Sequence, residues 1–444
     1  MKLKSLTVIL FSLTSSLVVA NESTSKYEPK SIADNAFFKD TKIVLSTKNY
    51  WKYLKEEAEN PKTVHNAWGH GVAVSYQSGY LADFISLNAD FYRAFRLAAS
   101  DHFASRGVLY NKGNKAKSSN AGGYTKIGQR YVKLKTKVAD VNLNGNIGWH
   151  TMKNFGVISN TTRLSPTTYQ GYSATLNYDE VTLKGAYITH SISRDSPDKK
   201  QFKSRDGKHT IDYIATGDIS LKNKFYSAEY AIGESKDYLR RQIFLGSIKP
   251  IDKLTIGTQL YFTKSLNNYK KMALSKRYFD KHANHYAADV KWQDDKWGAK
   301  IGIAYTDAKK GQGQLGYYHR HMSSHSRGTF MSMTQAGEDY LRHGERALST
   351  IIDYKLYPDL TLGLTANYGE FKFRHTTVRS SEFNLFTSWI PTNNSLKGLT
   401  LWGMVGPGWS YKHKNRTPIL RNGKSQTAPF LGAEFIAEYR FNLL

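Results

Sequence analysis

The stretch LGAEFIAEYRFNL at residues 431–443 decides the fold of this chain, because its side chains alternate between two kinds. Aliphatic and aromatic residues take the odd positions, whereas the charged residues Glu434, Glu438 and Arg440 take even positions. Successive side chains of a β-strand point to opposite faces. An apolar stripe facing lipid and charges facing a lumen are typical of the wall of a transmembrane β-barrel.

The same alternation recurs at 254–262 and 297–305, and turn signals divide the chain into hairpins. Short breaks lie near 82–83, 139–140, 179–180, 222–223, 251–253, 294–296, 358–359 and 393–395. Longer polar segments lie between them, at 54–67, 98–124, 151–171, 191–212, 264–283, 307–347 and 411–428. Eight short turns with both termini on the same rim predict an all-β, antiparallel barrel of 18 strands. A barrel of this size is too wide for side chains to fill, which predicts an aqueous channel.

The first twenty residues predict export. Two lysines, an apolar run and a small residue at position 20 form a secretory signal, with residues 21–444 left as one barrel domain. After residue 20 no apolar run is long enough for a spanning helix, and mean hydropathy is −0.53, so a helical membrane protein is excluded. The chain has no cysteine, so no disulfide framework is expected. The predicted location is the outer membrane of a Gram-negative bacterium.

The formal charge is +27, or +25 without the signal segment. Export and the scattered positions of the basic residues argue against a nucleic-acid partner. We expect contact with membrane lipid and with the phosphates of lipopolysaccharide, aided by the basic segments 112–117 and 412–416.

Two stretches resemble one family of porins. WGHGVAVSYQSGY at 68–80 is similar to the second strand of OprD-type outer-membrane porins, and RLSPTTYQG at 163–171 is similar to the end of their inward-folded constriction loop. FFKD at 37–40, SGYLAD at 78–83, GQGQLGYY at 311–318 and GERA at 344–347 resemble the chitoporin branch. The resemblance implies long extracellular loops and selective passive diffusion across the outer membrane through a monomer or homotrimer.

The sequence also departs from that family. Amino-acid-selective members resemble one another in a ladder of lumenal arginines that begins with Arg-Asn-Tyr, whereas Lys48-Asn49-Tyr50 stands here. The strand predicted at 399–404 has no arginine, and the chain ends in Leu444 where a terminal Phe is usual. Because a lysine does not reproduce the bidentate fork of arginine, guidance of carboxylates by such a ladder is in doubt.

The alternation also selects the residues that face the lumen. The predicted charged lining is Lys42, Lys48, Lys133, Lys135, Lys291, Lys300, Arg440, Asp90, Asp289, Glu434 and Glu438, and the predicted aromatic lining is Tyr50, Tyr92, Tyr131, Tyr261 and Trp402. A net positive wall favours anions modestly, whereas aromatic faces beside polar groups suit sugars. Alternatively, these rings belong to the membrane-interface girdles, or a bulge shifts the alternation by one residue.

In the constriction-loop motif, Arg163 and Tyr169 are candidates for solute contact. The alternative is structural: Pro166 and Gly171 shape the fold-back, and Arg163 pairs with a wall carboxylate. His319, His321 and His325 have a spacing that could hold a transition metal, but a solvated loop is the favoured interpretation, and no metal or cofactor is expected. No spacing of Ser, His and Asp suggests an enzyme.

Three functions remain open. The first is a porin for chitooligosaccharides or related amino sugars. The second is a porin of the same fold for basic amino acids, peptides or organic anions. The third is a surface adhesion or receptor barrel whose long loops bind a partner.

Overall fold

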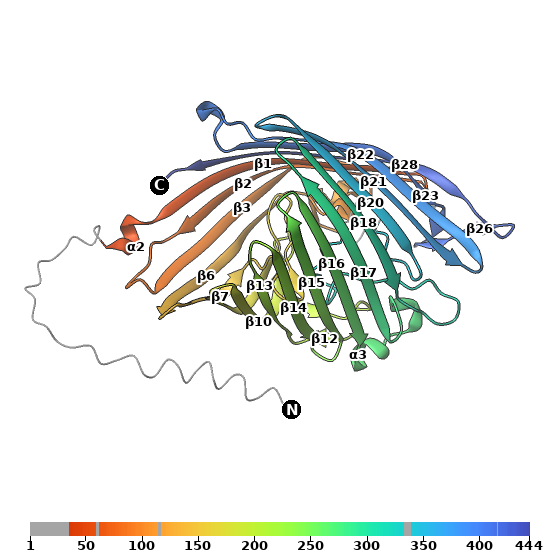
Figure 1. Cartoon of the computed structure of the whole chain (residues 1–444), viewed down its shortest axis with the longest axis horizontal. Helices are drawn as coiled ribbons and strands as arrows, with labels where there is room; N and C mark the ends of the chain where they lie inside the picture. The colour runs from red at the N-terminus through yellow and green to blue at the C-terminus, as the bar shows by residue number, and fades with distance from the viewer. Residues whose placement is uncertain (1–34, 59–61, 114–116, 333–338, 415) are drawn as a thin grey trace, which may run out of the picture.

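A closed wall of antiparallel strands surrounds a lumen in the computed structural model, which describes residues 35–58, 62–113, 117–332, 339–414 and 416–444 (Figure 1). Within these residues, eighteen strands form the wall, and each pairs with the next in sequence. The wall closes where β28 pairs with β1. The predicted 18-stranded barrel is therefore confirmed.

The wall strands are β1 (Lys42–Glu56), β2 (Thr63–Gln77), β3 (Ile85–Ala99), β6 (Tyr124–Val138), β7 (Val141–His150), β9 (Thr168–Tyr178), β10 (Val181–Ile192), β13 (Ile214–Lys222), β14 (Tyr226–Ser235), β15 (Leu239–Ile251), β16 (Leu254–Ser265), β17 (His282–Gln293), β18 (Trp297–Asp307), β20 (Arg346–Tyr357), β21 (Leu360–Phe373), β22 (Thr376–Trp389), β23 (Leu399–Tyr411) and β28 (Thr427–Asn442). The short strands are β4 (Tyr110–Asn111), β5 (Ala121–Gly122), β8 (Ile158–Ser159), β11 (Lys199–Lys203), β12 (Thr210–Ile211), β19 (Arg327–Gly328), β24 (His413–Lys414), β25 (Thr417–Pro418), β26 (Leu420–Arg421) and β27 (Lys424–Ser425). The helices are α2 (Ala36–Lys39) and α3 (Asn267–Lys270), with 3-10 turns η3 (Phe103–Arg106), η4 (Ser118–Asn120), η5 (Leu274–Lys276) and η6 (Asn394–Leu396).

One rim of the barrel carries the short turns. All eight predicted breaks are connections on this rim, where α2 and the end of β28 also lie (Figure 1). Several of these turns are tight, with positive φ at Ala82, Asp83, Ala139 and Asp179. Asp and Asn tolerate this left-handed conformation better than most residues, which is why such residues mark the turns in sequence.

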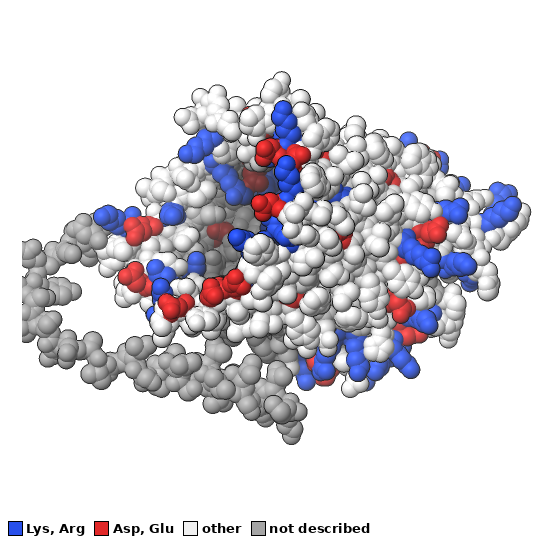
Figure 2. All heavy atoms as spheres, viewed as in Figure 1, with Lys and Arg blue, Asp and Glu red and all other residues white. Residues whose placement is uncertain are grey.

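The opposite rim carries the long loops, and α3 and β26 lie there (Figure 1). Two connections on this rim were missed, at 236–238 and 374–375, because they are as short as the turns of the other rim. The predicted polar segment at 54–67 is largely strand, since β1 runs to Glu56 and β2 begins at Thr63. Lys and Arg side chains gather around α3 and toward β26 in the space-filling view (Figure 2).

The outer face is apolar and the inner face is mixed. On β18, Ile301 and Ile303 are 54% and 61% exposed, as expected of side chains that face lipid. An outward row of cross-strand neighbours includes Tyr230, Phe244 and Tyr305, as expected of an aromatic girdle. In the described part of the chain, no helix is long and apolar enough to cross a membrane.

A β-bulge in β6 changes the alternation once. The pairing with β3 shifts between Asp90 and Phe91, which face Gln129 and Ile127. Gly128 is the extra residue, so that even positions before it and odd positions after it point into the lumen. The predicted lining residues of β6 are Tyr131, Lys133 and Lys135, which all follow Gly128 in sequence. They point into the lumen as predicted from the alternation.

Candidate functional site

The segment 151–167 folds from the rim into the lumen and crosses it. At one end, the Nζ atom of Lys126 on β6 donates hydrogen bonds to the carbonyls of Pro166 (3.1 Å) and Ser193 (2.6 Å). At the other end, the backbone N–H of Gly156 donates to Asp218 Oδ2 on β13 at 2.7 Å. The loop is therefore held to the wall at β6 and β13, and it reaches from Tyr50 of β1 to Gly233 of β14, which places it as a constriction.

Leu164 seats this loop against β2. A Cβ atom on Gly69 would lie 2.6 Å from Leu164 Cδ1, and one on Gly71 would lie 3.3 Å from Leu164 Cβ. Two glycines in the WGHG motif thus leave the space that Leu164 fills. Leu164 joins a buried cluster with Tyr50, Phe103, Leu109 and Tyr124. The loop packs against the wall as a core does.

A second segment, 308–345, joins the first inside the barrel. Strand β8 of the first segment pairs with β19 of the second. The Tyr169 hydroxyl donates to the Ser159 carbonyl at 2.7 Å and accepts from the Arg327 N–H at 3.0 Å. Tyr169 is 0% exposed, so it offers a solute no surface.

Arg241 on β15 anchors the second segment to the wall, and sequence reasoning missed it. Its guanidinium donates to the carbonyls of Arg320 and His319, both at 2.6 Å, and to Thr263 Oγ1 at 2.9 Å. The side chain is fully buried. The alternation of side chains predicts only that an arginine points inward. It does not distinguish an arginine that lines the aqueous channel from one that binds a loop.

The remaining opening of the channel is bordered by β28 and β1. Five of the predicted lining residues come together there: Lys48, Tyr50, Glu434, Glu438 and Arg440. Glu438 accepts from Lys48 at 2.5 Å and from Arg440 at 2.6 Å. Glu434 accepts from both Tyr50 and Lys52. The space-filling view shows a hollow edged by acidic and basic side chains (Figure 2).

Arg163 reaches this opening from the constriction loop. Its guanidinium carbon lies 5.1 Å from the centre of the Tyr50 ring, within the range of a cation–π contact. Its Nε atom is buried without a protein hydrogen-bond partner among the described residues. Arg163 therefore lies near the Tyr50–Glu434 pair, although no ion pair within 4 Å joins it to a carboxylate among the described residues.

Two further arginines, which the sequence analysis did not select, add positive charge beside the opening. Burial and the positive charge of the nearby Arg163 together lower the pKa of Arg194 to about 10. Burial also lowers the pKa of Arg106, in η3. The carbonyl of Arg194 accepts from Tyr124 and Ser165, at 2.6 and 2.8 Å, which fixes its backbone beside the constriction loop.

The other predicted lining residues lie apart from this group. Asp90 accepts from Tyr92 at 2.8 Å and from Gln129. Lys133 faces Ser86 and Asn146 across the sheet. Lys42, at the start of β1, is exposed on the short-turn rim. Gln129 also accepts from Thr151 at the start of the constriction loop, so Asp90 is linked to that loop, whereas Lys42 lies at the short-turn rim.

The predicted aromatic track is only partly available. Tyr50, Tyr92 and Tyr261 point inward but are 2%, 8% and 0% exposed. Tyr131 and Trp402 also point inward and are half-buried. Most of the predicted ring faces are therefore covered by neighbouring side chains or by the loops.

The three histidines of the long loop are partly exposed, as the favoured interpretation of a loop expects, and two of them also pack on each other. The rings of His319 and His321 stack on each other at 4.8 Å inside the loop region, and the His325 carbonyl accepts from Ser191 at 2.6 Å. Among the described residues, no group of three or more His, Cys, Asp or Glu side chains is placed to hold a metal ion. The predicted signal segment, residues 1–20, lies outside the described residues.

Comparison with known proteins agrees with this architecture. The family model described as outer membrane porin, OprD family, matches residues 35–401. No curated protein matches the chain. Among solved structures, Acinetobacter baumannii OccAB3 is similar with 17% identity and a TM-score of 0.71, covering 91% of this chain and 100% of that one.

Two structures from Pseudomonas aeruginosa are similar to a comparable degree. OccK9 (OpdG) has 15% identity and a TM-score of 0.71, covering 92% of this chain and 100% of its own. OpdK with vanillate has 14% identity and a TM-score of 0.68, covering 91% and 100%. At these identities the similarity concerns the fold.

Proposed function

Because the chain belongs to the OprD family of outer-membrane porins, we propose that its channel favours small organic anions. The protein is a porin of the outer membrane, through which small solutes diffuse passively. Porins are not enzymes, and nothing in this channel suggests catalysis. The proposal concerns which solutes pass most readily.

The observation that supports an anion is the charge at the constriction. Three arginines lie near the wall at this point: Arg163, Arg194 and Arg106. The wall carboxylates Glu434 and Glu438 are already bonded to lysines and to Tyr50. Guanidinium groups near neutralised carboxylates leave an excess of positive charge where the solute must pass. Vanillate, named with the OpdK structure, is an aromatic carboxylate and fits the same class.

Chitooligosaccharides remain the second candidate. Trp402 and Tyr131 keep part of their rings accessible on the inner face, and a sugar could stack on them. Three of the five aromatic rings expected to bind a sugar are covered by other parts of the protein. We therefore favour the anion channel over the sugar channel.

The test is channel current in a planar bilayer. We expect anions to be more permeant than cations in a salt gradient, and vanillate to block the current more than chitohexaose or arginine. Arg163→Gln should lower the anion-to-cation permeability ratio by roughly twofold or more. Arg421→Gln, an exposed arginine in β26, is the matched control and should leave the ratio unchanged.

Each other outcome has a distinct meaning. Block by chitohexaose alone would favour the sugar channel. Cation preference in the unaltered protein would contradict the anion proposal. A closed barrel with no conductance would favour the adhesion or receptor alternative.

Lipopolysaccharide phosphates are the proposed lipid partner of the long-loop rim. Lys270, Lys271 and Lys276 are exposed around α3, in addition to the predicted basic segment that includes Lys412 and Lys414. Exposed cations next to the membrane boundary attract anionic headgroups. We expect lipopolysaccharide to raise the melting temperature of the purified barrel, and dephosphorylated lipid to lose this effect. The oligomeric state, a monomer or a homotrimer, stays a prediction.

A further inference from the structure

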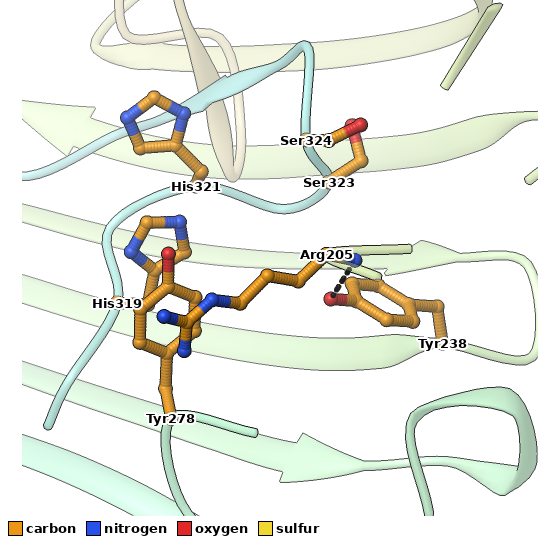
Figure 3. Close-up of a pocket in the computed structure, with 7 residues that line it drawn as sticks. All are labelled: Arg205, Tyr238, Tyr278, His319, His321, Ser323 and Ser324. Atoms are coloured by element: carbon orange, nitrogen blue, oxygen red, sulfur yellow. Dashed lines mark hydrogen bonds between the residues drawn. The ribbon is translucent and has the colours of Figure 1, made fainter. Parts of the chain in front are cut away.

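A cavity of about 210 Å³ lies among the loops of the long-loop rim, and Figure 3 shows the residues that line it. Four separate loops build it. Arg205 comes from the turn between β11 and β12, Tyr238 from the hairpin between β14 and β15, and Tyr278 from the segment after α3. The segment 308–345 contributes the rest, and the lining residues from that segment are His319, His321, Ser323 and Ser324.

One wall of the cavity is a continuous stack of flat groups. The Arg205 guanidinium carbon lies 3.7 Å from the centre of the Tyr278 ring. His319 stacks on Tyr278 at 3.9 Å with an interplanar angle of 13°, and His321 stacks on His319 at 4.8 Å and 16°. Stacking of this kind fixes the guanidinium plane, so Arg205 is held in place before any ligand arrives.

The polar groups of the cavity are donors or neutral. The Tyr238 hydroxyl accepts the Arg205 backbone N–H at 3.2 Å, as the dashed line in Figure 3 marks, and its own O–H is a further donor. Ser323 and Ser324 add hydroxyls. The guanidinium donates to the Arg277 carbonyl at 3.4 Å, a weak bond that leaves most of its five N–H donors for a ligand.

Among the described residues no carboxylate lines the cavity, and two acids near it bond to groups outside it. Asp206 accepts from Ser204 at 2.5 Å and from the Lys208 N–H at 3.2 Å. Asp280 Oδ2 accepts from the Gly311 N–H at 2.8 Å, whereas its buried Oδ1 has no hydrogen-bond partner among the described residues. Arg205 is therefore a cation without a carboxylate beside it in the described lining of the cavity.

The two histidines do not add charge near neutral pH. Burial, together with the neighbouring Arg327 and Arg320, lowers the pKa of His321 to about 3. Burial, His321 and Arg416 hold the pKa of His319 well below its ordinary value. Both imidazoles are neutral at pH 7, which leaves Arg205 as the charged group that a ligand would meet.

We propose that this cavity is a binding site for a small carboxylate, with Arg205 as its charged partner and the serine and tyrosine hydroxyls as additional donors. A guanidinium binds a carboxylate through two parallel hydrogen bonds, and the stack presents it in a fixed plane. The volume suits a small ring-bearing acid such as benzoate. The site lies on the loop side of the barrel, so it would hold an anion before the constriction does, whichever solute crosses the channel.

The test uses benzoate and benzamide, which share a shape and differ in charge. Purified full-length protein carrying ¹³C-labelled histidine reports on the cavity, because the His319 and His321 rings lie in its wall. We expect benzoate to shift their imidazole resonances saturably, with an affinity near the millimolar range. Benzamide should shift them at least tenfold more weakly.

Variants of Arg205 make the test specific. Arg205→Gln should weaken benzoate binding by tenfold or more, and Arg205→Lys should lie between, because it keeps the charge and loses the fork. Arg240→Gln is the matched control, since Arg240 is exposed on the adjacent hairpin and bonds to Glu234 outside the cavity. The control should bind benzoate as the unaltered protein does.

The outcomes separate this proposal from the proposed function. Histidine shifts that are equal for benzoate and benzamide, or unchanged by Arg205→Gln, would overturn the carboxylate site. So would the absence of any shift at saturating benzoate. Because anion selectivity is read from current and depends on Arg163, loss of selectivity in Arg163→Gln with intact histidine shifts would leave both proposals standing.

Discussion

The two halves of the lumen carry the same alternation of side chains and differ in what covers them. Along β9 to β17, inward residues such as Tyr169, Ile188 and Tyr261 are buried in one large cluster with the segments 151–167 and 308–345. Along β28 and β1, inward residues such as Lys48 and Glu438 form ion pairs that stay partly exposed. Placement of the loops, more than the wall sequence, decides which half is a core and which is a channel.

The largest effect on this contrast is expected from Arg241→Met, which removes the bond between wall and loop. Two partly buried carbonyls, those of His319 and Arg320, lose their donor, which costs about 2–5 kcal/mol of loop docking. We expect the single-channel conductance to rise and the segment 308–345 to become sensitive to protease. Arg241→Lys should keep part of the docking, and unchanged conductance in Arg241→Met would show that the loop is held by its other contacts.

A smaller effect is expected from Gly69→Ala, on the side where the constriction loop meets β2. The added methyl group would lie 2.6 Å from Leu164 and must displace it, at a cost of about 1–3 kcal/mol. Because Arg163 precedes Leu164, we expect altered anion selectivity together with a lower melting temperature. Gly145→Ala is the control: its methyl group would meet neighbours at 3.7 Å or more and should change neither quantity.

Acidification should loosen the packed half gradually. The folded pKa of His321 is about 3, below its ordinary value of 6.5, so the docked loop binds fewer protons than the released loop between these values. Docking is therefore fully favoured above pH 6.5 and weakens as pH falls toward 3. We expect more frequent conductance fluctuations at pH 5 than at pH 7. His321→Gln should flatten this dependence, and an identical pH response in that variant would assign the effect to another group.

The smallest effect is expected in the open half, from Trp402→Ala. Its ring is half-buried, so its loss should weaken any block by chitohexaose by about twofold. Trp409→Ala, on the outer face of the same strand at 48% exposure, is the control. A tenfold loss for Trp402→Ala would restore the sugar track as the leading proposal.

The wall could be predicted from the sequence because its signals are local. Alternation assigned Glu434 and Lys48 to the inner face, and Asp- and Asn-containing turns located the short rim. The hairpin at Arg374 and His375 was missed because it is as short as those turns. Local signals do not indicate which rim a short turn belongs to.

The packed half could not be predicted because it depends on contacts between distant segments. Arg241 binds carbonyls 78 and 79 residues away, and Tyr169 bonds to Arg327 at a separation of 158. Arg241 and Lys48 follow the same inward pattern, and only the folded loop distinguishes an anchor from a lining residue. The same reason explains why three predicted aromatic faces are covered.

The seam between β28 and β1 has a consequence for biogenesis. Tyr50 and Glu434 are separated by 384 residues, and their bond exists only once these two strands pair. Contacts of such high sequence separation form late, after most of the loop-closure entropy has been lost. Closure of the wall and formation of the polar contacts beside the constriction are thus one event. A barrel whose β28 and β1 have not paired would therefore lack the lining that selects solutes.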